Sequence, residues 1–414
     1  QTKLSLVLNS PKYSPLSKIK NNNPLSHRKS ASPMTKPLNW LLFMSVVSSI
    51  SKRPLQVAQG LKVAVLGSGI AGSTAARELA ERGTQVTVFE VGFGIGGRTS
   101  TRITRDNDRY QFDHGAQYIG KPKTTEFGTA LMIWEQGGYV KEWKGRFATV
   151  SDGVVTHDEP GKPHYVGYPG MHSICRNLLH HENIRVVTQT RACATHLENN
   201  NESGSFCWSI ASHKNKKKAL GEFDWLVASD RLSATDNRAD LRNAPLPEFK
   251  SRVKNIANVP SLTLMVAFER PLELPLDGIQ FQGGSSGALG WAARDTSKPG
   301  RERSDGRECW VVQSEPKKAQ SILDSIKKKE KNFEKRRDLV REEAKDILLD
   351  DFISAVSKLS ATDSAIPNVC SAVGHRWSAA FPIPTQEAET DDDNYFERQQ
   401  NFVACGDYMG KYTG

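Results

Sequence analysis

A glycine-rich turn between a predicted buried strand and a predicted helix constrains this chain more than any other feature. The apolar run at 63–66 is followed by Gly67, Gly69 and Gly72, and the apolar positions after them keep helical spacing as far as Gly83. In such a turn the first glycine permits the tight bend, the second lets the backbone approach a pyrophosphate, and the third lets the helix pack close to the strand. The pattern therefore predicts a dinucleotide site whose phosphates face the helix N-terminus.

An acidic residue stands where such a site needs one. A second predicted strand at 85–89 places Glu90 at its carboxyl end, where a carboxylate accepts hydrogen bonds from a ribose hydroxyl and rejects a 2′-phosphate. Ile70 and Ala71, at the predicted helix start, complete the loop that would contact the dinucleotide. An ordinary strand–turn–helix with purely structural glycines would explain this acid less well.

A second glycine-rich segment follows the acid and indicates which dinucleotide to expect. A nicotinamide dehydrogenase has no need of the VGFGIGGR run at 91–98, whereas in a flavoprotein the extended FAD passes such a loop with its pyrophosphate and ribityl groups. Gly96 and Gly97 would allow close approach of the backbone, and Arg98 would offer charge to the phosphates or to the flavin edge. The expected cofactor is therefore FAD.

These motifs resemble those of the flavin-dependent amine oxidase superfamily, whose members carry a similar E-x(n)-GGR segment. The DHGAQY stretch at 113–118 is similar to the renalase-like branch, and the resemblance runs from about Val63 to the end, weakest between 236 and 364. Further similar segments are YVGYPGM at 165–171, IRVVT at 184–188, DWLVAS at 224–229, GHRW at 374–377 and VACGD at 403–407. The resemblance implies that the strand containing Val187 meets the adenine through its backbone, and that Gly406 and Asp407 lie at the ribityl chain.

The resemblance also implies an α/β fold in which the chain passes back and forth between two domains. A three-layer, Rossmann-like FAD-binding domain would take residues 61–120, 165–238 and 394–414. An α+β substrate domain, built on a mixed or antiparallel sheet, would take residues 121–164 and 239–393.

Three segments of the substrate domain carry clear patterns of their own. Alternation at 261–268 and the CWVVQ run at 309–313 predict strands. The segment 327–358 is strongly charged and predicts an amphipathic surface helix preceded by a solvated KKKEK tract, because Glu and Asp interleave the Lys and Arg residues. Its apolar positions are Phe333, Leu339, Ala344, Leu348 and Phe352.

The positive charge of the chain is concentrated before these domains. The formal net charge is +10, yet nine cations lie at or before Arg53 and the first acid is Glu78, which leaves the remainder close to neutral and argues against a nucleic-acid partner. The leader at 1–60 is rich in Ser, Asn, Pro and Lys, as in an organelle transit peptide, and its excess of Lys over Arg favours a chloroplast over a mitochondrion. The apolar run at 40–47 is too short to cross a bilayer, so no transmembrane segment is expected.

Neither the cysteines nor the histidines have the spacing of metal ligands. The six cysteines include no C-x-x-C pair and the histidines no H-x-x-x-H pattern, so no metal is expected. Separated thiols in a chain of 414 residues fit a reducing compartment. Cys405, directly before Gly406, could carry a covalent flavin link, but packing as a small buried hydrophobe is favoured.

The expected catalytic residues lie in two segments. By the resemblance, His114 and Gln117 stand on a segment that runs alongside the flavin ring, where they could hydrogen-bond a substrate; His114 could equally hold the loop through backbone contacts. His375, Arg376 and Trp377 place donors beside a large aromatic ring, and they could line the substrate cavity or cap a strand. Packing is favoured over a place in the pocket wall for Tyr118, Trp291 and Phe381.

The resulting hypothesis is an FAD-dependent oxidoreductase of the renalase-like branch, which the resemblance associates with oxidation of misreduced dihydro-NAD(P) isomers. The expected partners are a small-molecule substrate, with a nicotinamide dinucleotide among the candidates, and oxygen or another electron acceptor. An amine or polyamine oxidase, a plastid carotenoid-desaturase-like or porphyrinogen-oxidase-like enzyme and a non-catalytic flavin-fold scaffold remain as alternatives. In relatives a helix follows the G-D element; a chain ending at Gly414 stops before that helix and is expected to hold FAD poorly.

Overall fold

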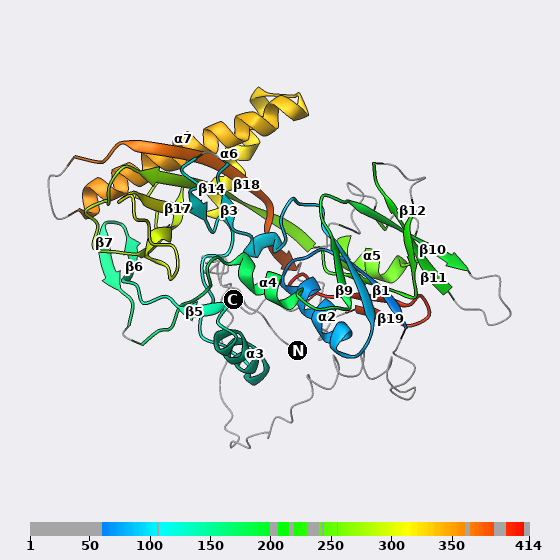
Figure 1. Cartoon of the computed structure of the whole chain (residues 1–414). Coiled ribbons are helices and arrows are strands. Elements are labelled where there is room, and N and C mark those ends of the chain that lie inside the picture. Colours follow the sequence, from blue (N-terminus) through cyan, green and yellow to red (C-terminus); the bar gives the residue numbers. More distant parts are fainter. Residues whose placement is uncertain are drawn as a thin grey trace, which may run out of the picture.

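The computed structural model describes residues 60–409, apart from positions 106, 160, 199–205, 215–218, 231–232, 234–239, 242–243, 255, 361–364 and 385–394. The expected leader before residue 60 and the chain end after residue 409 therefore lie outside the described residues. Two large sheets form the two halves of the molecule, which lie side by side in Figure 1.

The first half is built on a six-stranded sheet with the order β19-β20-β13-β1-β2-β9. Its strands are β1 (Lys62–Leu66), β2 (Gln85–Phe89), β9 (Ile184–Val187), β13 (Trp225–Ala228), β19 (Tyr395–Glu397) and β20 (Phe402–Ala404). All neighbours are parallel except β19 and β20. The strand, turn, helix and strand expected from the first motif are confirmed as β1, α2 (Ile70–Glu81) and β2.

Different elements cover the two faces of this sheet. Val63 and Val65 pack with α2 on one face, beside α4 (His172–Leu178). Ala64 and Leu66 pack on the other face. That face is covered by the antiparallel β10 (Ala192–Glu198), β11 (Phe206–Ser212) and β12 (Ala219–Phe223), together with α5 (Pro247–Lys254). The three layers are those expected. Buried residues that follow position 240 also pack on this face: Leu241, Ala244, Leu246, Phe249, Val253 and Ile256.

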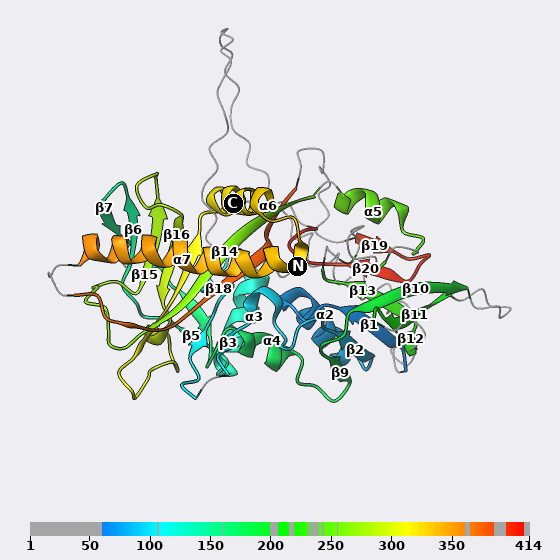
Figure 2. The same ribbon diagram turned by 90° about the horizontal axis from the view of Figure 1, so that it is seen from above.

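The second half is built on a seven-stranded sheet with the order β18-β14-β17-β16-β15-β6-β7. Its strands are β6 (Phe147–Ser151), β7 (Val154–His157), β14 (Ile256–Phe268), β15 (Gly278–Gln282), β16 (Leu289–Arg294), β17 (Glu308–Ser314) and β18 (Val369–Pro384). Every neighbouring pair is antiparallel except β6 with β15, so the sheet is mixed, as expected. The long strands β14 and β18 extend from this sheet toward the first half (Figure 2).

Two charged helices, α6 (Pro316–Lys329) and α7 (Phe333–Leu359), cover one face of the second sheet (Figure 1). The amphipathic surface helix expected after the KKKEK tract is α7. The helix α6 ends within that tract at Lys329, and the Asn332 side chain caps α7 by accepting from the Lys335 N–H. On α7 a stripe with helical spacing is buried on the sheet, formed by Val340, Ala344, Leu348, Phe352 and Val356. Within the described part of the chain, no helix combines the length and the apolar character that crossing a membrane requires.

Short elements fill the space between the halves. They are η2 (Gly97–Thr99), β3 (Arg102–Ile103), β4 (Gln111–Phe112), α3 (Thr125–Gln136), β5 (Val140–Glu142), β8 (Tyr165–Gly167) and η4 (Asp295–Ser297). Tyr110 and Phe112 pack against Met265 and Val311, on the face of the second sheet opposite to α7. This packing brings the DHGAQY segment, which follows β4, to the junction of the two halves.

Candidate dinucleotide and active site

The turn after β1 has the geometry that close approach of a ligand requires. Gly67 has φ +100°, a backbone conformation that favours glycine. A Cβ on Gly72 would overlap the Gly67 carbonyl oxygen and lie 2.6 Å from Ser229 Oγ, so this glycine lets α2 pack against the turn. A Cβ on Gly69, in contrast, would meet no atom within 4 Å. The backbone at Gly69 therefore borders open space at the N-terminus of α2, where Ile70 and Ala71 follow.

Glu90 lies at the carboxyl end of β2, as the sequence predicts, and the turn holds its carboxylate in place. Ser68 donates to Oε2 from its N–H at 3.0 Å and from its hydroxyl at 2.6 Å, and the Gly92 N–H donates to Oε1 at 2.6 Å. The backbone N–H of Glu90 donates to the Val187 carbonyl at 2.9 Å, which ties β9 to the same corner. A fixed, half-buried carboxylate beside a glycine turn suits a ribose hydroxyl.

The second glycine segment lies directly against the first. Gly96 pairs with Gly69 in a parallel bridge, and its N–H donates to the Ser68 carbonyl at 3.1 Å. Gly96 and Gly97 have φ +110° and +53°, and a Cβ on Gly97 would lie 3.3 Å from Gly69 Cα. The two segments that the sequence assigns to one cofactor thus form one surface.

Arg98 and Asp407, expected near the phosphates and the ribityl chain, form an ion pair with each other. The guanidinium donates to Asp407 Oδ2 at 2.6 Å and to Oδ1 at 2.7 Å, and to the Ala380 carbonyl at 3.1 Å. Gly406, with φ +130°, shapes the turn before this acid. The pair joins the loop after β2, the end of β18 and the segment after β20. Cys405 is buried in the core of the first half, and burial raises the pKa of its thiol to about 12, which fits packing rather than a reactive thiolate.

Three of the expected catalytic residues meet although they come from distant parts of the sequence. The His114 ring stacks on Trp377 with 5.1 Å between ring centroids, and it meets His375 edge-on at 4.9 Å. The Trp377 indole N–H donates to the His114 carbonyl at 2.9 Å. This aromatic cluster of His114, His375 and Trp377 joins β18 to the segment after β4.

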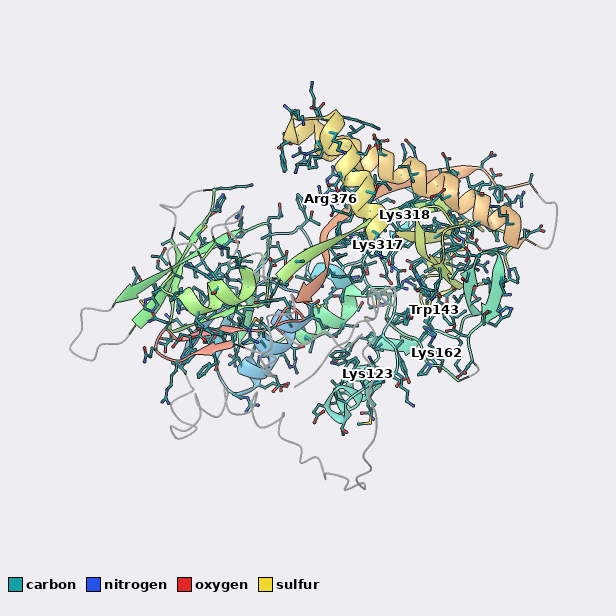
Figure 3. All side chains as sticks on the ribbon, turned by 180° about the vertical axis from the view of Figure 1, so that it is seen from behind. Lys123, Trp143, Lys162, Lys317, Lys318 and Arg376 are labelled. Atoms are coloured by element: carbon teal, nitrogen blue, oxygen red, sulfur yellow. The ribbon has the colours of Figure 1, made fainter. Side chains whose placement is uncertain are left out.

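Arg376 and Gln117, the other two expected catalytic residues, do not belong to this cluster. Side chains alternate along β18, so Arg376 is on the face opposite to His375 and Trp377. It is exposed on the side of α6 and α7, where Figure 3 shows it with Lys317 and Lys318, and its pKa is lowered by burial of part of the side chain and by Arg336. Gln117 is fully enclosed: its amide donates to the carbonyls of Asp113 and Gly115 instead of pointing to a substrate.

A buried network of charges lies behind the cluster, and sequence reasoning did not find it. Asp113 accepts from Arg301 at 2.7 Å, from Thr101 Oγ1 at 2.6 Å and from Lys298 at 3.4 Å. Lys298 also contacts Asp295 at 2.6 Å, and Asp295 accepts from the Asp113 N–H at 3.1 Å. Burial would raise the pKa of Asp113, but Arg301 and Lys298 outweigh it and hold this pKa below its ordinary value. The network fixes the DHGAQY segment to the second half.

A small recess of about 20 Å³, roughly the space that one water molecule needs, lies in the second sheet next to this segment. Gln313, one of its lining residues, donates from its side-chain amide to the Gly115 carbonyl at 2.6 Å. The other polar and aromatic lining residues include Gln280, Phe281, Trp291 and Phe381. Among the described residues the buried Trp291 indole N–H has no hydrogen-bond partner. The sequence sign of a special role for Gln313 is its place as a polar residue at the end of the apolar CWVVQ run. Trp291 and Phe381, expected to be packing residues, are buried and also line the recess.

The two clustered histidines predict a loss of stability in mild acid. Burial and Arg102 lower the pKa of His114 to about 4, and burial, His114 and Arg102 lower that of His375 to about 3, against 6.5 in the unfolded chain. Below pH 6.5 the unfolded chain therefore binds protons that the folded chain does not, so the free energy of unfolding should fall by about 1.4 kcal/mol per pH unit for each imidazole.

Denaturant titrations between pH 7 and pH 4.5 measure this slope. The substitution His114→Phe, which keeps an aromatic ring on Trp377, should reduce it, and His157→Gln at an exposed site should leave it unchanged. A slope unaffected by His114→Phe would contradict the prediction.

Comparison with known proteins agrees with this architecture. Residues 65–131 match the model of a family described as an NAD(P)-binding Rossmann-like domain. The fold is similar to that of a candidate protoporphyrinogen oxidase from Exiguobacterium sp. 255-15, with a TM-score of 0.56 and 10% identity over 84% of this chain and 94% of that chain. An oxidoreductase from Methanosarcina mazei has the same TM-score and identity, over 84% of this chain and 95% of the other. The chain thus has a mixed α/β fold with a Rossmann-like NAD(P)-binding domain, as the sequence predicts.

Proposed function

We propose that this protein is an FAD-dependent oxidoreductase that acts on a small molecule. The observation that carries the proposal is the single surface formed by the two glycine segments, where a Cβ on Gly69 would enter open space beside the fixed Glu90 carboxylate. Such a surface accepts the adenosine and pyrophosphate parts of a dinucleotide. The second glycine segment and the Arg98–Asp407 pair extend this surface toward the second half. A cofactor that continues beyond its adenylate part, as FAD does, would need such an extension.

The residues that would hold FAD can be assigned along this surface. The backbone from Gly67 to Gly72 would face the pyrophosphate, and Glu90 the adenosine ribose, while Arg98 and Asp407 would exchange their mutual contacts for contacts to the cofactor. When bound, FAD supplies a ring that accepts a hydride from the substrate and returns the electrons to oxygen or another acceptor.

The proposed substrate site is the surface around the aromatic cluster of His114, His375 and Trp377. The small recess that Gln313 links to Gly115 would hold only a water-sized polar group beside it. The Trp291 N–H can donate a hydrogen bond to such a group, whereas the amide nitrogens of Gln280 and Gln313 already donate to backbone carbonyls. Glu315, the charged residue of the recess lining, accepts from the Lys318 N–H at the start of α6. The proposal of a dihydronicotinamide over a polyamine as substrate therefore rests on the resemblance of the DHGAQY segment at 113–118 to the renalase-like branch.

Replacing Gly69 with alanine tests the cofactor site without disturbing the fold. Gly69 has φ −67° and open space beside it, so the new methyl group should leave the melting temperature unchanged, yet it should occupy the space that the pyrophosphate needs. We expect FAD affinity to fall at least about tenfold, or 1.4 kcal/mol. Flavin uptake measured by fluorescence quenching reports this loss, with Gly128→Ala in α3 as the matched control. Unchanged affinity in the Gly69 variant would sink the assignment.

The substrate class needs a separate measurement. Anaerobic mixing of the flavin-loaded protein with dihydronicotinamide isomers should bleach the visible flavin spectrum, while spermine should leave it unchanged. Bleaching by spermine alone would favour an amine oxidase, and bleaching by neither would leave the flavin-fold scaffold as the better description.

A further inference from the structure

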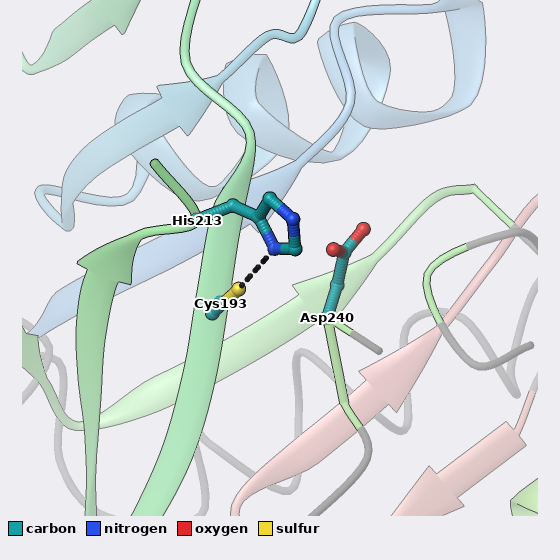
Figure 4. A group of neighbouring side chains, drawn as sticks. All are labelled: Cys193, His213 and Asp240. Atoms are coloured by element: carbon teal, nitrogen blue, oxygen red, sulfur yellow. Dashed lines mark hydrogen bonds between the residues drawn. The ribbon is translucent and has the colours of Figure 1, made fainter. Parts of the chain in front are cut away.

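The three-stranded sheet of the first half carries a cluster of potential metal ligands from three separate segments. Cys193 lies on β10, His213 directly follows β11, and Asp240 lies on the segment that leads to α5. The Cys193 Sγ and His213 Nδ1 atoms are 3.5 Å apart, and one ligand atom from each of the three residues lies within 4.8 Å of the others. Figure 4 shows the three side chains lying close together, with Cys193 and His213 joined by a hydrogen bond.

Backbone hydrogen bonds hold the three segments in register. The His213 N–H donates to the Arg191 carbonyl at 2.8 Å, and the Ala194 N–H donates to the Asp240 carbonyl at 2.9 Å. β10 and β11 are paired antiparallel over the whole of both strands. The positions of the ligands are therefore set by the sheet, so little conformational entropy would be lost when they engage an ion.

We propose that Cys193, His213 and Asp240 bind a divalent ion of the zinc class, with solvent at the fourth position. Thiolate, imidazole and carboxylate are the ligand types that zinc takes in proteins. In a tetrahedral zinc site, bond lengths of about 2.3 Å to sulfur and 2.05 Å to nitrogen place these two atoms about 3.6 Å apart. The separation of 3.5 Å between Cys193 and His213 is close to that value.

Arg191 gives the carboxylate its orientation. Its Nε donates to Asp240 Oδ1 at 2.7 Å, and the Asp240 side chain is buried. A partner of this kind behind a metal-binding carboxylate is common and fixes the direction of the ligand atom. The positive charge of Arg191 offsets one of the two negative charges of the thiolate and carboxylate ligands. A divalent ion more than neutralises the negative charge that remains. The ion would join β10, the end of β11 and the segment before α5 as a structural clamp.

Zinc binding to the full-length chain tests this site and does not depend on flavin. After treatment with a chelator and dialysis against zinc chloride, wild-type protein should retain one zinc per chain by elemental analysis. Cys193→Ser and His213→Gln should each lose it, whereas Cys370→Ser and His157→Gln, at exposed cysteine and histidine positions, should keep it. Cobalt in place of zinc should give a thiolate-to-cobalt charge-transfer band that Cys193→Ser abolishes.

Two outcomes would overturn the proposal: wild-type protein that retains no stoichiometric zinc, or ligand variants that retain as much as the wild type. His213 is exposed, so His213→Gln should keep the far-ultraviolet circular dichroism of the wild type, and its result is independent of a folding defect. Arg191→Gln should weaken zinc binding by about tenfold. Flavin uptake should be unchanged in the His213 variant, which separates this site from the proposed cofactor site.

Discussion

Replacing Asp113 with asparagine should lower the free energy of unfolding by about 3–5 kcal/mol, because it leaves the buried Arg301 guanidinium without its counter-ion. Arg301 and Lys298 would keep their positions inside the protein, with Asp295 as the remaining carboxylate of the network. The asparagine has nearly the same shape, so the loss reports charge and not a cavity. Urea unfolding at pH 7 measures the change through the transition midpoint.

A surface ion pair provides the matched control for this prediction. Asp305 pairs with Arg303 in a partly exposed loop, and Asp305→Asn should cost no more than about 1 kcal/mol. Equal losses in the Asp113 and Asp305 variants would show that the buried network adds nothing beyond a surface pair.

The pH dependence of the Asp113 contribution has a definite sign. The folded pKa is held below 3.8, so the unfolded chain binds the proton first as the pH falls. The contribution is therefore complete above the unfolded pKa and is lost as the pH drops through the folded pKa. The clustered histidines contribute to the stability lost between pH 6.5 and 4, together with His164 and His172, whose pKa values burial also lowers. Comparing Asp113→Asn with His114→Phe over the same range separates the Asp113 effect from that of the cluster.

The local part of the cofactor site was predictable because adjacent residues determine it. The order of β1, the glycine turn, α2, β2 and Glu90 follows from apolar runs and turn residues alone. Motif resemblance added the DHGAQY and GHRW segments, and the structure brings His114 together with His375 and Trp377. The motif does not show which side chains share a face, but the alternation of side chains along a strand does. Arg376 stands between His375 and Trp377 in the sequence and therefore lies on the other face of β18.

The parts that the sequence did not reveal depend on contacts between distant segments. Lys298 and Arg301 lie in a segment rich in charged residues, where burial is not expected, and only the fold shows that both are enclosed around Asp113. The zinc-type cluster has the same origin. Ligand spacing along the chain predicts no metal, yet Cys193 and His213 become neighbours through the pairing of β10 with β11.

Replacing Gly72 with alanine should destabilise the protein and also abolish flavin uptake. The new Cβ would overlap the Gly67 carbonyl oxygen, which is backbone and cannot rotate away, so α2 must move off β1. Overpacking of this kind costs typically about 1–3 kcal/mol, and the upper end is expected because the obstacle is a main-chain atom. The displaced turn would also lose the arrangement in which its N–H groups face a pyrophosphate. Thermal unfolding and flavin titration of the same preparation measure the two effects.

The comparison with two neighbouring variants decides between packing and ligand contact. Ser229 donates from its hydroxyl to the Leu66 carbonyl at 2.8 Å and would also lie 2.6 Å from the new Cβ, so Ser229→Ala in the Gly72→Ala background removes one of the two obstacles. If the carbonyl of Gly67 is the main obstacle, this second substitution should restore little stability. Gly69→Ala should lose flavin with its stability intact, whereas Gly72→Ala should lose both. If Gly72→Ala kept wild-type stability, the helix could shift freely at this turn. The close packing of α2 on β1 would then not hold the loop in its binding geometry.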